Sequence, residues 1–141
     1  MPRNDGKDAE AGFLSIMTRL GAVVERFWDQ ADLRGRNGGR AVGDFPKPSD
    51  FLVTLNGLLQ YAEVKSTTST TSFSFHSIQK GQSSAALRQA RVHGPYNFYI
   101  YSFHLAQWFL MPCKQYAETL DAGRASIKFE ELTPWNPFSP I

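Results

Sequence analysis

The sequence predicts one α/β domain in which a mixed central sheet is flanked by helices. Three observations favour this class. Two apolar runs meet at an Asn-Gly dipeptide, which is typical of a hairpin turn; a helical stretch at residues 77–93 separates that hairpin from two further strands; and 141 residues, 42% of them hydrophobic, suit one core. A helix between two strands implies a crossover that joins parallel strands. No internal repeat or domain boundary is visible, so we expect a single domain over residues 1–141.

The first half of the chain contains a predicted helix, a basic loop and the hairpin. Apolar residues recur with helical spacing from Glu10 to about Leu33, which predicts an amphipathic helix. Residues 1–9 before it are polar, and we expect them to be disordered. Residues 34–43 (RGRNGGRAVG) are rich in glycine and arginine, which predicts a loop. The hairpin strands are expected at 51–55 and 58–64.

The second half alternates between strands and helices. Residues 66–72 (STTSTTS) predict a polar loop, and Phe73 and Phe75 alternate as in a short strand. The Gly94-Pro95 pair ends the helix at 77–93. The remaining expected elements are strands at 97–103 and 107–112, a helix at 114–121, a strand at 126–131 and an extended tail at 132–141. We expect the aromatic residues of the two strands to pack in the core rather than to stack on bases. They are Phe98, Tyr99, Tyr101, Phe103, Trp108 and Phe109.

Positive charge is concentrated in the middle of the chain. The net charge is +2 overall, but residues 34–91 contain eight basic and three acidic residues, a net charge of +5. This distribution predicts contact with a polyanion such as nucleic acid, and a solvated basic surface is the alternative. The candidate DNA-binding residues are Arg34, Arg36, Arg40, Lys47, Lys80 and Arg88.

The polar N-terminal residues, the absence of a long apolar run and the low cysteine content indicate the cellular compartment. The first ten residues are polar, no apolar run is long enough to span a bilayer, and Cys113 is the single cysteine. We therefore expect a cytoplasmic protein. His76, His93 and His104 lack a common zinc-ligand spacing, so the sequence does not predict a structural zinc site.

Two carboxylates are expected to face each other across the hairpin. In a two-residue turn at Asn56 and Gly57, cross-strand partners have residue numbers that add to 113, and Asp50 and Glu63 satisfy this condition. Their Cβ atoms would lie roughly 4.5–5.5 Å apart, an unfavourable distance for two carboxylates unless a cation lies between them. Lys65, two residues after Glu63, projects from the same face of the strand.

Such a pair is consistent with more than one chemistry. Two carboxylates can act as general acid and base on a glycoside, or they can bind a hard divalent cation. A lysine on the same face favours the metal, because it can balance the charge of a phosphate or hold the attacking water. The structural alternative is a surface hairpin whose acid pairs with lysine. Asp44 is a rival acid, but the hairpin register does not place it opposite Glu63.

These residues resemble the signature of the PD-(D/E)xK nucleases, carried by Pro48-Ser49-Asp50 and Glu63-Val64-Lys65. More specifically, residues 47–48, 61–65 and 71–75, with Ile78 and Gln82, are similar to Holliday-junction resolvases of the RecU type, with kinship to archaeal Hjc resolvases. The similarity spans roughly residues 21–112. The resemblance implies a PD-(D/E)xK nuclease-like mixed sheet and a homodimer that nicks two opposing strands of branched DNA.

The resemblance also implies roles for single residues. Asp50, Glu63 and the backbone carbonyl of Val64 would bind Mg²⁺, with Mn²⁺ as a substitute, and Lys65 would position or activate water. Glu25 is similar to a helical glutamate near the metal, and an ordinary solvated glutamate is the alternative. Gln82 would support the site or be an ordinary polar helix residue.

Three functions follow from these observations. The first is a Mg²⁺-dependent endonuclease that resolves four-way DNA junctions, in a bacterium or its phage. The second is a PD-(D/E)xK nuclease that cuts ordinary duplex or single-stranded DNA. The third is a non-catalytic DNA-binding module whose acids are structural.

Overall fold

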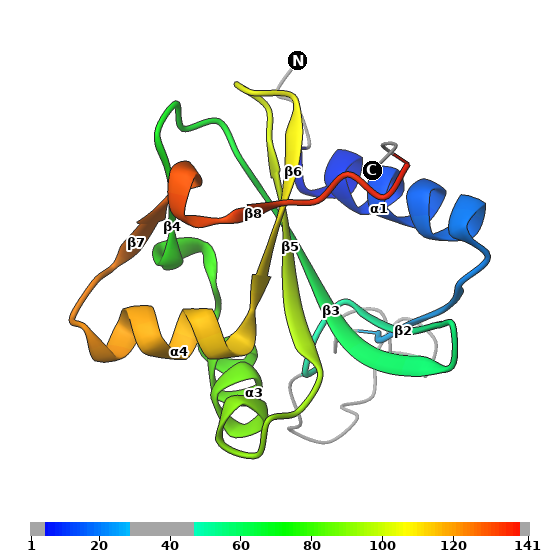
Figure 1. The fold of residues 1–141 in the computed structure, drawn as a ribbon, viewed down its shortest axis with the longest axis horizontal. Coiled ribbons are helices and arrows are strands. Elements are labelled where there is room, and N and C mark those ends of the chain that lie inside the picture. Colours follow the sequence, from blue (N-terminus) through cyan, green and yellow to red (C-terminus); the bar gives the residue numbers. More distant parts are fainter. Residues whose placement is uncertain (1–4, 29–46, 139–141) are drawn as a thin grey trace, which may run out of the picture.

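The computed structural model describes residues 5–28 and 47–138, and it confirms the predicted α/β class (Figure 1). The helices are α1 (Asp5–Leu20), α3 (Lys80–Arg91) and α4 (Cys113–Asp121). The strands are β1 (Val23–Arg26), β2 (Phe51–Leu55), β3 (Leu58–Thr67), β4 (Ser72–Ser74), β5 (Tyr96–Ser102), β6 (Gln107–Pro112), β7 (Ser126–Lys128) and β8 (Thr133–Pro134). Short 3-10 turns lie at Phe75–Ser77 and Phe129–Glu131.

Six strands form a mixed sheet in the order β1-β2-β3-β5-β6-β8, and β4 and β7 form a separate pair. Strands β3 and β5 are parallel, as the predicted crossover requires, and α3 lies between them in the chain. The other neighbouring pairs in the large sheet are antiparallel. The long strands β3 and β5 therefore form the centre of the molecule (Figure 1).

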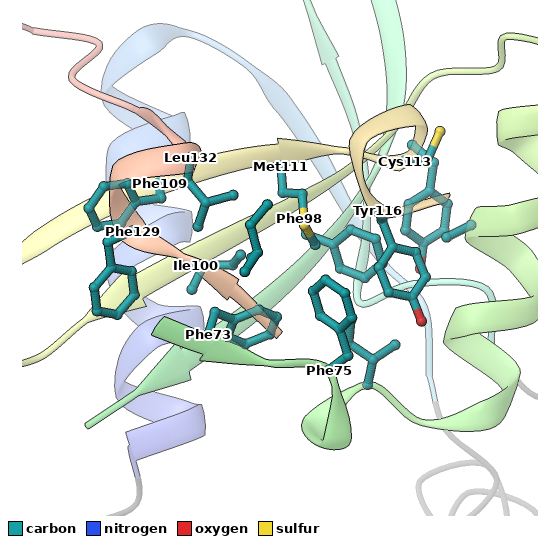
Figure 2. Close-up of a cluster of buried hydrophobic side chains, with 14 of the residues drawn as sticks. Phe73, Phe75, Phe98, Ile100, Phe109, Met111, Cys113, Tyr116, Phe129 and Leu132 are labelled. Atoms are coloured by element: carbon teal, nitrogen blue, oxygen red, sulfur yellow. The ribbon is translucent and has the colours of Figure 1, made fainter. Parts of the chain in front are cut away.

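The two faces of the sheet carry different hydrophobic clusters because side chains alternate along each strand. On one face Phe13 and Met17 of α1 pack with Phe51 and Val53 of β2. On the other face Phe98 of β5 belongs to a second cluster shared with α3, α4 and the β4–β7 pair (Figure 2). The sheet thus lies between α1 on one side and α3 and α4 on the other.

The hairpin turn has the predicted geometry. Asn56 and Gly57 both adopt positive φ, 53° and 78°, as a type I′ turn requires. The register pairs Leu55 with Leu58 and Phe51 with Ala62, so cross-strand numbers add to 113 as expected. The next pair outward in this register is Asp50 and Glu63.

The predicted helix from Glu10 to about Leu33 is wrong at both ends. The helix begins at Asp5, within the residues expected to be disordered, and it ends at Leu20. Gly21 follows with φ 84°, where its N–H and that of Ala22 donate to the carbonyls of Thr18 and Met17. The chain then enters β1, which pairs with β2, so the apolar residues after Gly21 belong to a strand. Residues 29–33 lie outside the described residues.

The other boundaries need smaller corrections. Strand β3 continues to Thr67, into the polar run expected to be a loop, because it pairs with β5 along its length. Phe73 lies in β4, whereas Phe75 begins a 3-10 turn, and the helix expected from residue 77 begins at Lys80. The strand expected at 126–131 ends at Lys128, and part of the tail forms β8 beside β6.

The predicted core packing of the strand aromatics is confirmed for five of the six. Phe98, Tyr99 and Phe109 are buried. Tyr101 and Trp108 are half-buried and pack against the cluster beneath α1, and Phe103 is half-buried beside Tyr101. No helix in the described part of the chain is long and apolar enough to cross a membrane.

Candidate active site

The site lies where β3 continues beyond the start of β2. Strand β2 begins at Phe51, opposite Ala62, and the part of β3 after Ala62 has no strand partner on that edge. Asp50 occupies the edge instead: its Oδ2 accepts a hydrogen bond of 2.9 Å from the Val64 N–H. Because the N–H and C=O of one strand residue point to the same side, the Val64 carbonyl also faces this open edge.

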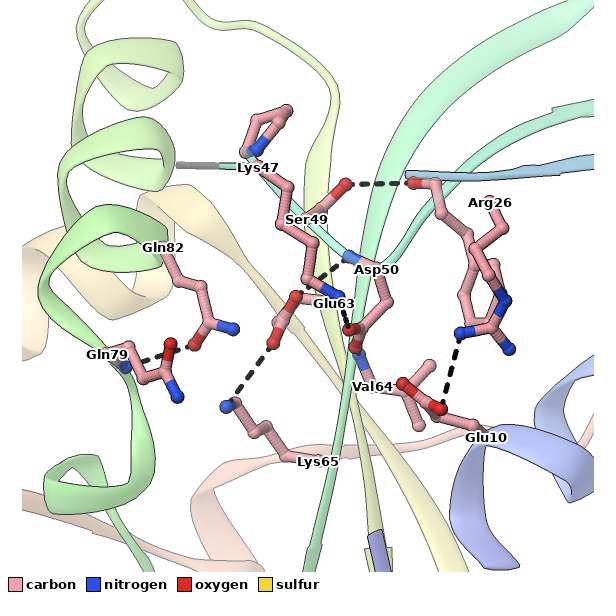
Figure 3. Close-up of polar contacts among 12 residues, drawn as sticks. Glu10, Arg26, Lys47, Ser49, Asp50, Glu63, Val64, Lys65, Gln79 and Gln82 are labelled. Atoms are coloured by element: carbon pink, nitrogen blue, oxygen red, sulfur yellow. Dashed lines mark hydrogen bonds and ion pairs between the residues drawn. The ribbon is translucent and has the colours of Figure 1, made fainter. Parts of the chain in front are cut away.

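The hairpin brings the predicted carboxylates together (Figure 3). The Asp50 N–H donates to Glu63 Oε1 at 2.9 Å, and only 5% of Asp50 and 1% of Glu63 are exposed. Each carboxylate has its own lysine: Lys47 Nζ lies 3.1 Å from Asp50 Oδ1, and Lys65 Nζ lies 3.3 Å from Glu63 Oε2. The Lys65 ammonium also donates to the Ser77 carbonyl at 2.9 Å. The acids do pair with lysine, as the structural alternative expects, but they are buried and do not lie on a surface hairpin.

Burial controls the protonation of Glu63. Loss of solvent, and then the negative charge of Asp50, raise the pKa of Glu63 to about 8 despite the opposing effect of Lys65 and Lys47. A carboxyl in this position is unfavourable as an isolated anion. A further cation in the cleft would favour its ionised form.

A third carboxylate comes from α1. Glu10 faces Asp50 across the cleft and lies 3.5 Å from Arg26 Nη1 (Figure 3). Burial and the charge of Asp50 raise the pKa of Glu10. Sequence reasoning missed this residue, although Glu10 is the acid that precedes Gly21 in the predicted helix, and Gly21 was a visible stop signal.

Glu25 is not at the cleft in the structure. It lies in β1, opposite Leu52, and its side chain is exposed. The expectation that Glu25 belongs to the first helix, near the carboxylate pair, is therefore wrong. The glutamate of α1 that faces Asp50 is Glu10.

The wall opposite α1 is the start of α3. Gln82 is buried, and its Oε1 accepts a hydrogen bond of 3.0 Å from the Gln79 N–H, which caps the helix. The walls enclose a cleft of about 420 Å³. The cleft is lined by Gly6, Lys7 and Glu10 from α1, by Lys47, Asp50, Glu63, Val64, Lys65 and Ser66 around the hairpin, and by Gln79 and Gln82.

The candidate DNA-binding residues have different locations. Lys47 lines the cleft. Lys80 and Arg88 are exposed on α3. Arg34, Arg36 and Arg40, and the rival acid Asp44, lie outside the described residues.

The donor atoms at this site fit a hard divalent cation. Asp50, Glu63 and the Val64 carbonyl offer oxygen ligands at one edge, with Glu10 opposite. Within residues 5–28 and 47–138, no group of three His, Cys, Asp or Glu side chains is arranged to hold a metal ion. Two carboxylates and a backbone carbonyl are a donor set that Mg²⁺ can use, because it is bound by one or two carboxylates and keeps several waters.

Comparison with known proteins gives a fold but no family. No protein-family model matches the chain, and no curated protein sequence matches it either. Among solved structures, the bacterial homing endonuclease I-Ssp6803I is similar, with 13% identity, 99% of this chain and 82% of that chain covered, and a TM-score of 0.52. The Holliday junction resolvase Hjc of Archaeoglobus fulgidus gives 18% identity, 79% and 75% coverage, and a TM-score of 0.49. The nuclease-like fold expected from the sequence is confirmed.

Proposed function

We propose that this protein is a Mg²⁺-dependent endonuclease that resolves four-way DNA junctions by paired nicks, acting as a homodimer. The observation that supports it best is the buried Asp50–Glu63 pair with Lys65 on the same edge of the sheet. Although each carboxylate has a lysine beside it, the pKa of Glu63 stays raised to about 8, so a further cation would favour the ionised pair. The resolvase-like spacing of residues 47–82 supports a junction as the substrate.

Each residue of the cleft has a part in the proposed reaction. Asp50, Glu63 and the Val64 carbonyl hold Mg²⁺, and Glu10 supports them from α1. When bound, the cation supplies a more acidic water and offsets charge on the scissile phosphate. Mn²⁺ would substitute, and Ca²⁺ would support binding with little turnover.

Lys65 is placed to act on the phosphate or the attacking water. Its ammonium lies 3.3 Å from Glu63 Oε2 and donates to the Ser77 carbonyl. An ammonium has three protons, so it can also donate to an oxygen in the cleft. Because Glu63 and Ser77 hold the ammonium in place, it favours a positioned water or phosphate.

One assay separates this function from the alternatives. A labelled four-way junction, a duplex of the same sequence and its single strands are each incubated with protein in Mg²⁺ or in excess chelator. We expect paired nicks in the junction with Mg²⁺ and none with chelator. Faster cutting of duplex or single strands would favour a general nuclease, and binding without any cutting would favour a DNA-binding module. Undiminished cutting in chelator would overturn the metal mechanism.

The dimer has its own measurement. Light scattering on the purified chain is expected to give twice the mass of 15.8 kDa. A monomer at concentrations that support paired nicking would contradict this part of the proposal.

A further inference from the structure

A second cavity lies on the other side of α1 from the cleft. Its volume is about 310 Å³, which is within the usual range for a small-molecule site. Helix α1 contributes Asp8, Ala9 and Gly12, and the facing wall is Tyr101, Phe103 and Trp108. The function proposed above does not use this cavity.

The facing wall is aromatic and only partly used by the core. Tyr101 lies with its ring centroid 4.9 Å from that of Phe103 and 5.1 Å from that of Trp108. All three side chains are half-buried. These rings therefore present surface to the cavity, in contrast to the buried Phe98 and Tyr99 of β5.

Gly12 keeps the cavity open. A glycine inside a helix is less favourable than alanine, so its presence here calls for a reason. A Cβ at this position would lie 3.6 Å from Trp108 Cζ2, which is an ordinary contact, so packing does not demand glycine. A side chain at position 12 would instead lie against the aromatic wall and reduce the space.

The cavity and the cleft share helix α1 as a wall. Gly6, Lys7 and Glu10 of α1 line the cleft, whereas Asp8 and Gly12 line the cavity. A helix with its side chains is about 10–12 Å across, a distance that a few nucleotides of a DNA strand would cover. In the sheet, Ser66 of the cleft is paired with Tyr101 of the cavity.

We propose that this cavity binds one unpaired base of the DNA strand whose phosphate lies in the cleft, a role that rests on the proposed function. The aromatic wall supplies the stacking surface that bases of any kind use. Stacking of this kind tolerates every base, so no single base is expected to be strongly preferred.

The test measures single-strand binding in excess chelator, where no cleavage occurs. A short labelled oligodeoxycytidine is titrated with the wild-type protein, with Gly12→Leu, which fills the cavity, and with Phe103→Ala, which removes stacking surface. Each variant is expected to weaken binding about fivefold or more, the lower end of the loss of one stacked base. Ala11→Leu, on an exposed neighbouring position of α1, is the matched control and is expected to bind as wild type does.

Fold and base preference are checked in the same experiment. Gly12→Leu is expected to melt at or above the wild-type temperature, because leucine favours a helix more than glycine does. Oligothymidine is expected to bind about as tightly as oligodeoxycytidine, because stacking does not read the identity of the base. Equal binding by folded Gly12→Leu and wild type would overturn the inference, whether or not the junction is cleaved. If the wild-type protein cleaves no DNA but Gly12→Leu still weakens single-strand binding, the result would count against the nuclease function and not against the base-binding cavity.

Discussion

Two glutamates of this protein each pair with a basic side chain, but their surroundings shift their pKa values in opposite directions. At the surface Glu131 forms two hydrogen bonds with Arg124, of 2.8 and 2.6 Å, and the pairing lowers its pKa to about 2. In the cleft Glu63 has Lys65 at 3.3 Å, yet burial and Asp50 raise its pKa to about 8. A glutamate that serves only as an ion pair resembles Glu131. Glu63 is kept where its charge is unfavourable, as a ligand for a further cation would be.

The largest expected effect is on cleavage by variants of the buried pair. Asp50→Asn and Glu63→Gln should each reduce single-turnover cleavage of a four-way junction at least a hundredfold, about the loss seen when one charge-stabilising group is removed. Junction binding in a gel shift should stay intact or tighten, because phosphate repulsion falls. Lys65→Ala should also reduce turnover strongly, with less loss of metal binding.

Glu131→Gln is the matched control for this comparison, since it neutralises the other paired glutamate and should leave cleavage unchanged. Asp44→Asn tests the rival acid. An inactive Asp44 variant together with an active Asp50 variant would contradict the assignment of the metal site.

A smaller effect, on Mg²⁺ affinity, is expected to distinguish Glu10 from Glu25 as the glutamate that supports the Asp50–Glu63 pair. Glu10→Gln removes the carboxylate that faces Asp50 and should reduce Mg²⁺ affinity about 10- to 100-fold, as supporting groups of a metal site do. Glu25→Gln changes an exposed strand residue and should leave affinity unchanged. Calorimetric titration with Mg²⁺ measures both variants, and the reverse order would restore Glu25 as the partner of the pair.

In the metal-free protein the two paired glutamates should affect the free energy of unfolding at opposite ends of the pH range. Glu63 should lower it as the pH rises, and Glu131 should lower it as the pH falls. Between about pH 4.5 and 8 native Glu63 binds its proton more tightly than the unfolded chain does, so stability should fall as pH rises through this window. Glu131 has a lowered native pKa, so its contribution is present above about pH 4.5 and is lost towards pH 2. Urea unfolding with chelator at a series of pH values measures both effects. Glu63→Gln should reduce the dependence of stability on pH between about pH 4.5 and 8. An unchanged dependence would contradict the effect of burial on the pKa of Glu63.

The smallest expected effect concerns the arginines of residues 34–43, for which the sequence predicts a loop. Replacing Arg34, Arg36 and Arg40 with alanine should weaken DNA binding and reduce the slope of log K against log salt by about 0.9 for each lost phosphate contact on duplex. Fluorescence anisotropy over a range of salt concentrations gives the slope. If it does not change, the loop does not contact DNA.

Local signals in the sequence determined the centre of the candidate site. The Asn-Gly turn fixes the register within a few residues of chain, so Asp50 and Glu63 could be paired from their numbers alone. The crossover helix between the hairpin and the later strands could also be predicted, because its periodicity and the Gly94-Pro95 pair that ends it are local signals. These features depend on neighbouring residues in the chain and need no distant contact.

Contacts between residues far apart in the sequence determined β1, the placement of α1 and the surroundings of Trp108 and Tyr101. The four residues of β1 are a strand only because they pair with β2, and their apolar spacing also suited a longer helix. Glu10 reaches Asp50 because Phe13 and Met17 pack α1 against the sheet, a placement that periodicity does not specify. Trp108 and Tyr101 look like core residues in the sequence. Only the packing of α1, with glycine at position 12, leaves them open to a cavity.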